Sequence, residues 1–186
     1  MNKQLKMIIT AAGFALLLIT AVIGYQLLSS RVESPMDLES TSTQRQAAPD
    51  FSMVDNDGNA VRFSSLFGKP IVLNFWASWC PPCRIEMPDF DRVWKELGTG
   101  GTNEVYFVML NLVDGRRETV EIAQRYINEH GYSFPVYFDV HQEGARAYFI
   151  RSIPTTIFID RDGNIINGIQ GAINEQTLRR GIDLIR

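Results

Sequence analysis

Two continuous apolar runs stand out along this chain, at residues 70–77 (PIVLNFWA) and 104–112 (EVYFVMLNL). Apolar runs of this length, bounded by polar residues, predict strands that are buried on both faces of a sheet. Between them, residues 81–97 carry apolar side chains at helical spacing, with Phe90 and Val93 on one face. A helix that joins two buried strands predicts a β-α-β unit with parallel strands.

Shorter patterns on both sides of this unit predict its neighbours. Ahead of it, FSMV and AVRF flank a turn sequence at residues 55–58, which predicts an antiparallel hairpin. After it, TTIFID and IINGIQG flank a turn at residues 161–164 and predict a second hairpin. The other predicted elements are helices at 116–129, 142–149 and 174–185 and a strand at 134–139. This order predicts an α/β fold in which helices cover both faces of a mixed sheet.

The N-terminal part of the chain differs from the rest, because Met7 to Leu28 contain no charged side chain. Such a run suits a single membrane-spanning helix, which needs about 20 apolar residues. Lysines precede the run and acidic residues follow it, so we expect the N-terminus in the cytoplasm. A cleaved signal peptide is the alternative, but its apolar core is typically about 7–15 residues long. We predict a membrane anchor at residues 1–28, a flexible linker at 29–46 and an extracytoplasmic domain at 47–186.

The overall charge excludes one class of partner. The formal net charge of the chain is −3, so the chain lacks the basic surface that nucleic-acid-binding proteins need. Apolar residues make up 45% of the chain, which is enough for a packed core.

Both cysteines of the chain lie in one motif, WCPPC, directly after the first apolar run. A zinc site would need four ligands, and beyond Cys80 and Cys83 the chain offers only His130 and His141. An inert disulfide is a second interpretation, although so short a loop constrains the unfolded chain little. The third is a redox-active dithiol, which needs neither a metal nor a cofactor. We favour the dithiol.

The predicted helix start gives the two cysteines different roles. Pro81 and Pro82 suit a first helical turn, so Cys80 lies at the N-terminus of the helix. The partial positive charge there favours a thiolate, which makes Cys80 the expected nucleophile and Cys83 the resolving cysteine. Trp79 is expected to cover one side of the site.

A carboxylate one turn further along the helix is the candidate proton carrier. Glu86 lies three residues after Cys83 and four before Phe90, on the apolar face. Burial raises the pKa of a carboxyl group and suits it to proton transfer near neutral pH. We predict that Glu86 carries the proton of Cys83. The alternative is a solvated side chain, displaced by a kink at Pro88.

The segments FWASWCPPCRIEMP and SIPTTIFIDRDGNI together resemble the membrane-anchored, thioredoxin-like oxidoreductases of the TlpA/ResA type, over roughly residues 47–186. The resemblance implies a thioredoxin-like three-layer sandwich with an added N-terminal β-hairpin. It matches Cys80 and Cys83 to the redox pair, Glu86 to the active-site glutamate and Pro154 to the cis-proline that faces the dithiol. The residues expected to contact substrate are Trp79, Pro81, Pro82, Ile153 and Pro154.

The resemblance also implies a function. We expect a membrane-tethered thiol-disulfide oxidoreductase that reduces disulfides in partner proteins, such as apocytochrome c before haem attachment, and that draws electrons from a membrane donor. The alternatives are an oxidant that uses the same residues, a peroxidase and a copper-binding module. Asn74 stands where cytosolic thioredoxins carry a buried Asp, so the proton role moves elsewhere. Arg116 and Arg117 are interpreted as a solvated surface pair with a possible part in substrate choice.

Overall fold

The computed structural model describes residues 16–20, 22–23, 46–98 and 104–186, and the chain divides into two units, Met1–Gln44 and Arg45–Arg186. In the first unit the described residues are helical and exposed. Among the residues described here, no helix is long and apolar enough to cross a membrane. Most of the predicted anchor and linker lies outside the described residues.

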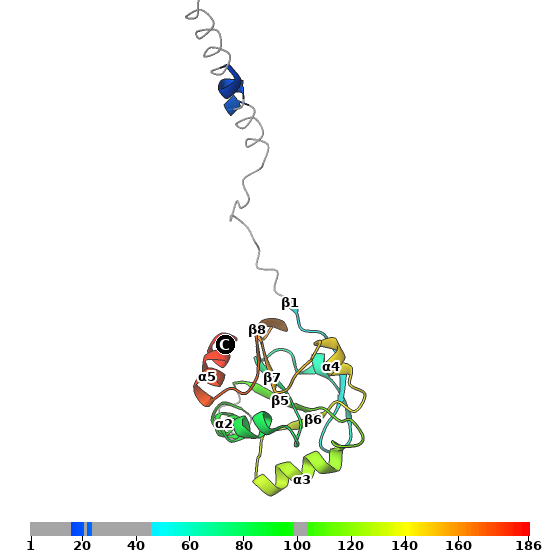
Figure 1. Ribbon diagram of the computed structural model, residues 1–186. Coiled ribbons are helices and arrows are strands. Elements are labelled where there is room, and N and C mark those ends of the chain that lie inside the picture. The colour runs from blue at the N-terminus through cyan, green and yellow to red at the C-terminus, as the bar shows by residue number, and fades with distance from the viewer. Residues whose placement is uncertain (1–15, 21, 24–45, 99–103) are drawn as a thin grey trace, which may run out of the picture. The chain divides into compact units, whose positions relative to one another are not determined.

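The second unit is built on one mixed sheet of eight strands (Figure 1). The order across the sheet is β1-β8-β7-β4-β5-β6-β2-β3, so β4 lies inside it, parallel to β5 and antiparallel to β7. The predicted hairpins are both present, as β2–β3 and β7–β8. The strands are β1 Gln46–Ala47, β2 Ser52–Val54, β3 Ala60–Arg62, β4 Ile71–Trp76, β5 Tyr106–Asn111, β6 Val136–Phe138, β7 Thr155–Ile159 and β8 Asn164–Gln170.

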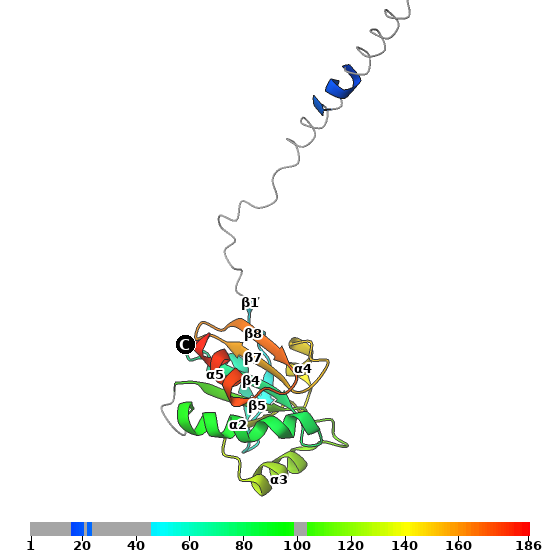
Figure 2. The ribbon, with the colours of Figure 1, turned by 60° about the vertical axis from the view of Figure 1, so that its left-hand side comes forward.

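Helices cover both faces of this sheet, which confirms the predicted three-layer α/β arrangement (Figures 1 and 2). The helices are α2 Pro81–Leu97, α3 Val120–His130, α4 Glu143–Ala147 and α5 Glu175–Asp183, with a 3-10 helix, η1, at Phe63–Leu66. Alternate residues of β4 face opposite layers. Val72 and Trp76 belong to one core with buried residues of α2, α3 and α5. Leu73 and Phe75 belong to a second core on the face covered by η1 and α4.

Two features differ from the sequence prediction. The helix expected from residue 116 begins at Val120, because Oδ1 of Asp114 accepts backbone N–H groups of the next residues and holds them in a turn. Thr119 then caps the helix by accepting the N–H of Ile122 at 3.3 Å. The strand β1 was not predicted, since two residues carry too little pattern to reveal a pairing.

The position of β1 shows where the chain enters the domain. Gln46 pairs with Ile165 at the start of β8. Because β7 is antiparallel to β4, the turn between β7 and β8 lies beside Ile71, at the start of β4. The helix α2 follows the other end of β4, after Trp76. The chain therefore enters at the end of the sheet opposite the N-terminus of α2.

Candidate active site

The two cysteines form a disulfide at the N-terminus of α2. Cys80 is the N-cap residue, and its sulfur accepts the backbone N–H of Cys83 at 3.3 Å. The exposed fraction of Cys80 is 2% and that of Cys83 is 0%. An external thiol or disulfide can therefore reach this pair only through Cys80. The asymmetry is the one expected of an attacking and a resolving cysteine.

The residues beside Cys80 are exposed, whereas Cys80 itself is nearly buried. Pro81 and Pro82 occupy the first two helical positions, as predicted, and both are exposed. An N–H group in the first turn of a helix has no carbonyl partner within the helix. Proline, which lacks an N–H group, therefore loses no hydrogen bond at these positions. Trp79 is 39% exposed. A large apolar ring that stays exposed beside a nearly buried sulfur provides a contact surface for a bound partner.

The loop before β7 closes the opposite side of the disulfide. The peptide bond between Ile153 and Pro154 is cis, as the resemblance implied. The carbonyl oxygen of Ile153 lies 3.6 Å from the sulfur of Cys80. A disulfide sulfur has no hydrogen to donate, but the reduced Cys80 thiol can donate to this oxygen. Ile153 is half-buried and Pro154 is buried, so this loop presents backbone and an aliphatic side chain beside Cys80.

Glu86 lies on the buried face of α2, with 1% of its surface exposed. The alternative prediction, a solvated Glu86 side chain displaced by a kink at Pro88, is therefore wrong. Its Oε1 accepts a hydrogen bond from Nδ2 of Asn74 at 2.9 Å, and its Oε2 accepts the backbone N–H of Ile173 at 3.0 Å. Burial raises the pKa of Glu86 to about 7, and the bonds from Ile173 and Asn74 oppose that rise. Such a carboxyl group exchanges protons near neutral pH.

Asn74 connects Glu86 to the sheet. It lies directly opposite Thr156 in the pairing of β4 with β7, and its Nδ2 also donates to Oγ1 of Thr156 at 3.0 Å. The Oδ1 of Asn74 is buried without a hydrogen-bond partner. The sequence interpretation noted only that Asn74 cannot titrate. In the structure it is the donor that faces the carboxylate.

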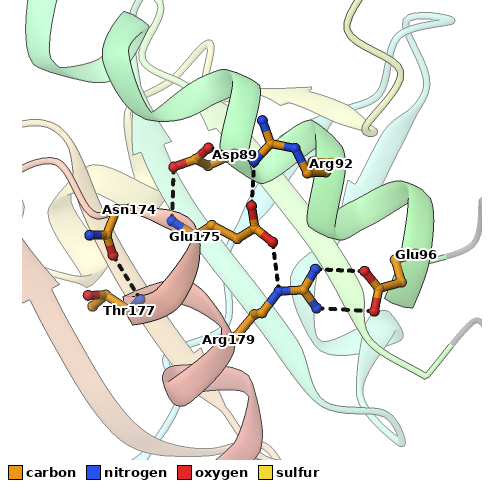
Figure 3. A network of polar contacts seen from close by, with 7 residues as sticks. All are labelled: Asp89, Arg92, Glu96, Asn174, Glu175, Thr177 and Arg179. Atoms are coloured by element: carbon orange, nitrogen blue, oxygen red, sulfur yellow. Dashed lines mark hydrogen bonds and ion pairs between the residues drawn. The ribbon is translucent and has the colours of Figure 1, made fainter.

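A polar network between α2 and α5 holds the segment that carries the second donor (Figure 3). Oδ2 of Asp89 accepts the backbone N–H of Glu175 at 2.9 Å, two residues beyond Ile173. The Glu175 side chain forms ion pairs with Arg92 and with Arg179. Arg179 in turn donates two bonds to Glu96 (Figure 3). The network ties the start of α5 to α2 close to the Glu86–Ile173 hydrogen bond.

A second buried carboxylate supports the residue before Trp79, and the sequence did not reveal it. Glu118 is fully buried and accepts the backbone N–H of Ser78 at 2.8 Å and its hydroxyl at 2.6 Å. It also accepts Nδ2 of Asn111, at the end of β5, at 2.5 Å. Three donors satisfy a carboxylate that would be costly to bury alone. The loop before α3 is thereby fixed to the active-site loop.

The same loop places a cation on Trp79. The guanidinium carbon of Arg117 lies 3.4 Å from the centroid of the Trp79 ring, well within the range of a cation–π interaction. Arg116 and Arg117 were interpreted as a solvated pair. Both side chains are exposed, but Arg117 is stacked on the ring next to Cys80.

The structure thus brings the eight predicted site residues together around one disulfide. Cys80, Cys83 and Glu86 follow one another along the first turns of α2. Of the predicted contact residues, Trp79, Pro81 and Pro82 are neighbours of Cys80 in the sequence. The other two, Ile153 and Pro154, belong to the loop whose carbonyl approaches the Cys80 sulfur. In the described ranges, no three His, Cys, Asp or Glu side chains are grouped so that they could hold a metal ion. The site's own chemistry is thiol–disulfide exchange.

Comparison with known proteins agrees with this geometry. A profile of the AhpC/TSA family matches residues 45–167. The thiol-disulfide oxidoreductase ResA of Geobacillus kaustophilus is 29% identical over 186 residues, which are 100% of this chain and 99% of that protein. ResA of Halalkalibacterium halodurans is 33% identical over 141 residues, 76% of each chain.

A solved structure gives the same result. The thiol:disulfide interchange protein of the thioredoxin family from Chlorobium tepidum aligns with a TM-score of 0.64 and 31% identity, over 76% of this chain and 97% of that one. Sequence and structure comparisons therefore agree on both the fold and the class of protein. The chain belongs to the AhpC/TSA family and to the thioredoxin-like thiol-disulfide oxidoreductases of the ResA type.

Proposed function

We propose that this protein reduces disulfides in partner proteins outside the cytoplasm, through Cys80 and Cys83. One observation carries the proposal. A nearly buried disulfide caps α2 and is accessible only at Cys80, and Glu86 is buried one turn beyond Cys83 with a pKa of about 7. This combination provides an attacking sulfur, a resolving sulfur and a proton acceptor in one helix.

Reduction proceeds by two exchanges. The Cys80 thiolate attacks one sulfur of the substrate disulfide, so that the substrate S–S bond breaks, a Cys80–substrate bond forms and the other substrate sulfur leaves as a thiolate. The Cys83 thiolate then attacks the Cys80 sulfur. This step forms the Cys80–Cys83 disulfide that the structure contains and releases the second substrate thiolate. Two electrons have passed from the dithiol to the substrate.

Glu86 carries the proton in the second exchange. Cys83 must lose its proton before it attacks, and it is fully buried, so water does not take that proton directly. Glu86 follows Cys83 by one helical turn. A carboxyl group with a pKa of about 7 is deprotonated often enough at neutral pH to accept a proton and is weak enough as an acid to keep it.

The dithiol must be reduced again after each turnover, and a membrane electron donor that carries thiols is the proposed source. The N-terminal segment would hold the domain near that donor and raise its effective concentration. The chain enters the domain at the end of the sheet opposite α2. Cysteines of apocytochrome c are the proposed substrates.

Trapping the substrate tests the proposal. A Cys83→Ala variant of the full chain, expressed in its own membrane, should accumulate a mixed disulfide between Cys80 and its substrate, because the resolving sulfur is missing. Cys80→Ala has the same number of cysteines and is the matched control. It should trap nothing, since Cys83 is fully buried. Equal trapping by both variants, or by neither, would contradict the proposed mechanism.

The direction of electron flow separates the proposal from its main alternative, an oxidant with the same residues. The full chain in detergent is equilibrated with buffers of reduced and oxidised glutathione, and the fraction of the Cys80–Cys83 disulfide is measured. A reductant requires a reduction potential well below that of the glutathione couple, and about 30 mV corresponds to about 1.4 kcal/mol for two electrons. A potential far above that couple would establish the oxidant.

A further inference from the structure

A groove of about 240 Å³ adjoins Cys80 on the side of Trp79 and the loop before Pro154. Its lining includes the apolar residues Trp79, Leu112, Ile150 and Ile153 and the charged residues Asp114 and Arg151. We propose that this groove selects substrate segments that carry an acidic residue near the reactive cysteine, and that Arg117 and Arg151 supply the selecting charges. The proposal rests on the proposed function, because it names the substrates that the dithiol accepts.

The position of Arg117 is set by its backbone. Oδ1 of Asp114 accepts the N–H groups of Arg116, Arg117 and Glu118 at 2.8, 2.7 and 2.9 Å. The turn closes when the carbonyl of Glu118 accepts the N–H groups of Asp114 and Gly115. Gly115 has a φ of 70°, a conformation that glycine adopts without strain. The loop is therefore ordered before a partner binds.

The loop is also tied to the residue next to Trp79. The carboxylate of Glu118 holds both the backbone and the hydroxyl of Ser78. Arg117 consequently faces the Trp79 ring from a loop that is fixed at Asp114 and at Glu118. A cation held in place loses less entropy when it meets a carboxylate than a freely rotating side chain does. This makes Arg117 more selective than an ordinary exposed arginine.

The charges around the groove favour an acidic partner. Arg151 lines the groove. Arg117 is not part of the lining but is stacked on the ring of Trp79, which is part of it. Within residues 46–98 and 104–186, neither arginine takes part in an ion pair within 4.0 Å. Asp114 is the acidic residue of the lining. The backbone N–H groups that its carboxylate accepts and the charge of Arg117 lower its pKa, so it stays ionised and offsets one of the two arginine charges. Arg117, Arg151 and Asp114 together leave one net positive charge at this edge, although the whole chain has a net charge of −3.

The shape of the groove indicates how such a segment lies. Leu112, Ile150 and Ile153 give it an apolar floor, next to the carbonyl of Ile153 that approaches the Cys80 sulfur. An extended segment would place an apolar side chain on this floor and a carboxylate against the arginines. We identify the occupant as a segment of the substrate protein with an acidic and an apolar residue close to its cysteine.

The experiment measures how fast Cys80 forms a mixed disulfide with short peptides. The full chain with Cys83→Ala, in detergent, reacts with peptides whose single cysteine is joined to 2-mercaptoethanol. Each peptide carries a leucine and, at one neighbouring position, Glu, Gln or Lys. At low ionic strength we expect Glu to react about threefold faster than Gln and Lys to react slower than Gln, as one or two exposed charge pairs allow. The preference should shrink near 1 M salt, where the Debye length is about 3 Å.

Charge-removing variants show whether the arginines cause the preference. Arg117→Gln and Arg151→Gln should each reduce the Glu-to-Lys rate ratio, and the double variant should abolish it. Arg161→Gln removes the same charge in the turn between β7 and β8, at the other end of the sheet, and should leave the ratio unchanged. A ratio that survives in the double variant would overturn the proposal.

A small uncharged disulfide, 2-hydroxyethyl disulfide, separates recognition from the intrinsic reactivity of Cys80. If Arg117→Gln slows this compound and all peptides equally, the arginine acts on the Cys80 thiolate and the proposal is wrong. An unchanged rate with the small disulfide, together with a lost peptide preference, would support it. If no peptide and no small disulfide reacts with Cys80 in any variant, the dithiol function itself fails, which is a different result from a lost preference.

Discussion

Asn74 donates a hydrogen bond to Glu86 across 2.9 Å, from the middle of β4 to the buried face of α2. An ionised carboxylate only accepts hydrogen bonds, so the amide group of Asn74 stabilises the charged form. Burial stabilises the neutral form. The two effects oppose each other and leave the pKa of Glu86 at about 7. The pKa of Glu86 is therefore close to neutral pH, as a proton carrier requires.

Replacement of Glu86 should change both stability and activity. Burial raises the pKa of Glu86 from 4.5 to about 7, so the contribution of its neutral form to stability is complete below about pH 4.5 and is lost as the pH rises to about 7. We expect Glu86→Gln to remove this pH dependence, which amounts to roughly 3 kcal/mol. Denaturant unfolding of the disulfide form between pH 4 and pH 8.5 measures it. Identical pH dependence of wild type and variant would contradict the assignment.

The same variant should slow disulfide reduction at neutral pH by about a hundredfold, as the loss of a general base commonly does. Single-turnover reduction of a protein disulfide by the reduced enzyme separates the two exchanges. The first, at Cys80, should change little, whereas resolution by Cys83 should become slow. A rate of resolution equal to that of the wild type would show that Glu86 carries no proton.

Loss of Asn74 should shift the titration of Glu86 upwards. Asn74→Ala removes the donor to Oε1, so the charged form loses a hydrogen bond and the pKa of Glu86 rises above its value in the wild type. The lower limb of the pH–rate profile for resolution should move to higher pH. Thr156→Val is the matched control, because Thr156 bonds to Asn74 but not to Glu86. A shift of equal size in both variants would mean that general packing is responsible.

The network between α2 and α5 can be used to test the hydrogen bond that the N–H of Ile173 donates to Glu86 (Figure 3). Asp89→Ala frees the N–H of Glu175 and loosens the segment that carries the N–H of Ile173. We expect a loss of about 1 kcal/mol in stability and a rise in the pKa of Glu86. Infrared difference spectroscopy of its carboxyl band measures this pKa.

Glu96→Ala removes a member of the same network at its other end, where Glu96 meets Arg179. This exposed pair should contribute little to stability, and the carboxyl band of Glu86 should titrate as in the wild type. If Glu96→Ala shifts that titration as much as Asp89→Ala does, the Ile173 segment is not what the network controls.

Removal of Glu118 should be strongly destabilising. Glu118→Ala leaves the half-buried N–H of Ser78 and the buried amide of Asn111 without their acceptor, at a cost of about 2–3 kcal/mol. Glu118→Gln retains one acceptor oxygen and should lose less. Glu129→Ala, on the exposed side of α3, should change stability by less than about 0.5 kcal/mol. Urea unfolding compares the three. Equal effects of the substitutions at 118 and 129 would contradict the role of the buried carboxylate.

Local pattern predicted much of this fold. The helix α2 runs over the predicted residues 81–97, because two prolines mark its start and an apolar face continues to Leu97. The burial of Glu86 followed from the same spacing, since residues four apart share a face. Pro154 required the family resemblance, because its sequence alone indicates only a proline at the start of a strand.

Contacts between distant segments could not be predicted from the local sequence pattern. Glu118 meets Ser78 across 40 positions of sequence, and nothing near Glu118 distinguishes it from a solvated residue. Arg117 lies on Trp79 only because Asp114 and Glu118 fix the loop between them. The donors to Glu86 come from β4 and from the residue before the cap of α5. Such pairings are set by the tertiary arrangement, and a one-dimensional period does not encode them.

The unequal reactivity of the two sulfurs is the centre of this account, and alkylation measures it directly. The full chain in detergent is reduced, treated briefly with iodoacetamide at a series of pH values, and mapped by mass spectrometry. We expect Cys80, at the N-terminus of α2, to be modified first and already below pH 7, with Cys83 remaining protected until Cys80 is modified or the protein unfolds. Equal labelling of both cysteines, with the pH dependence of a free thiol, would contradict it.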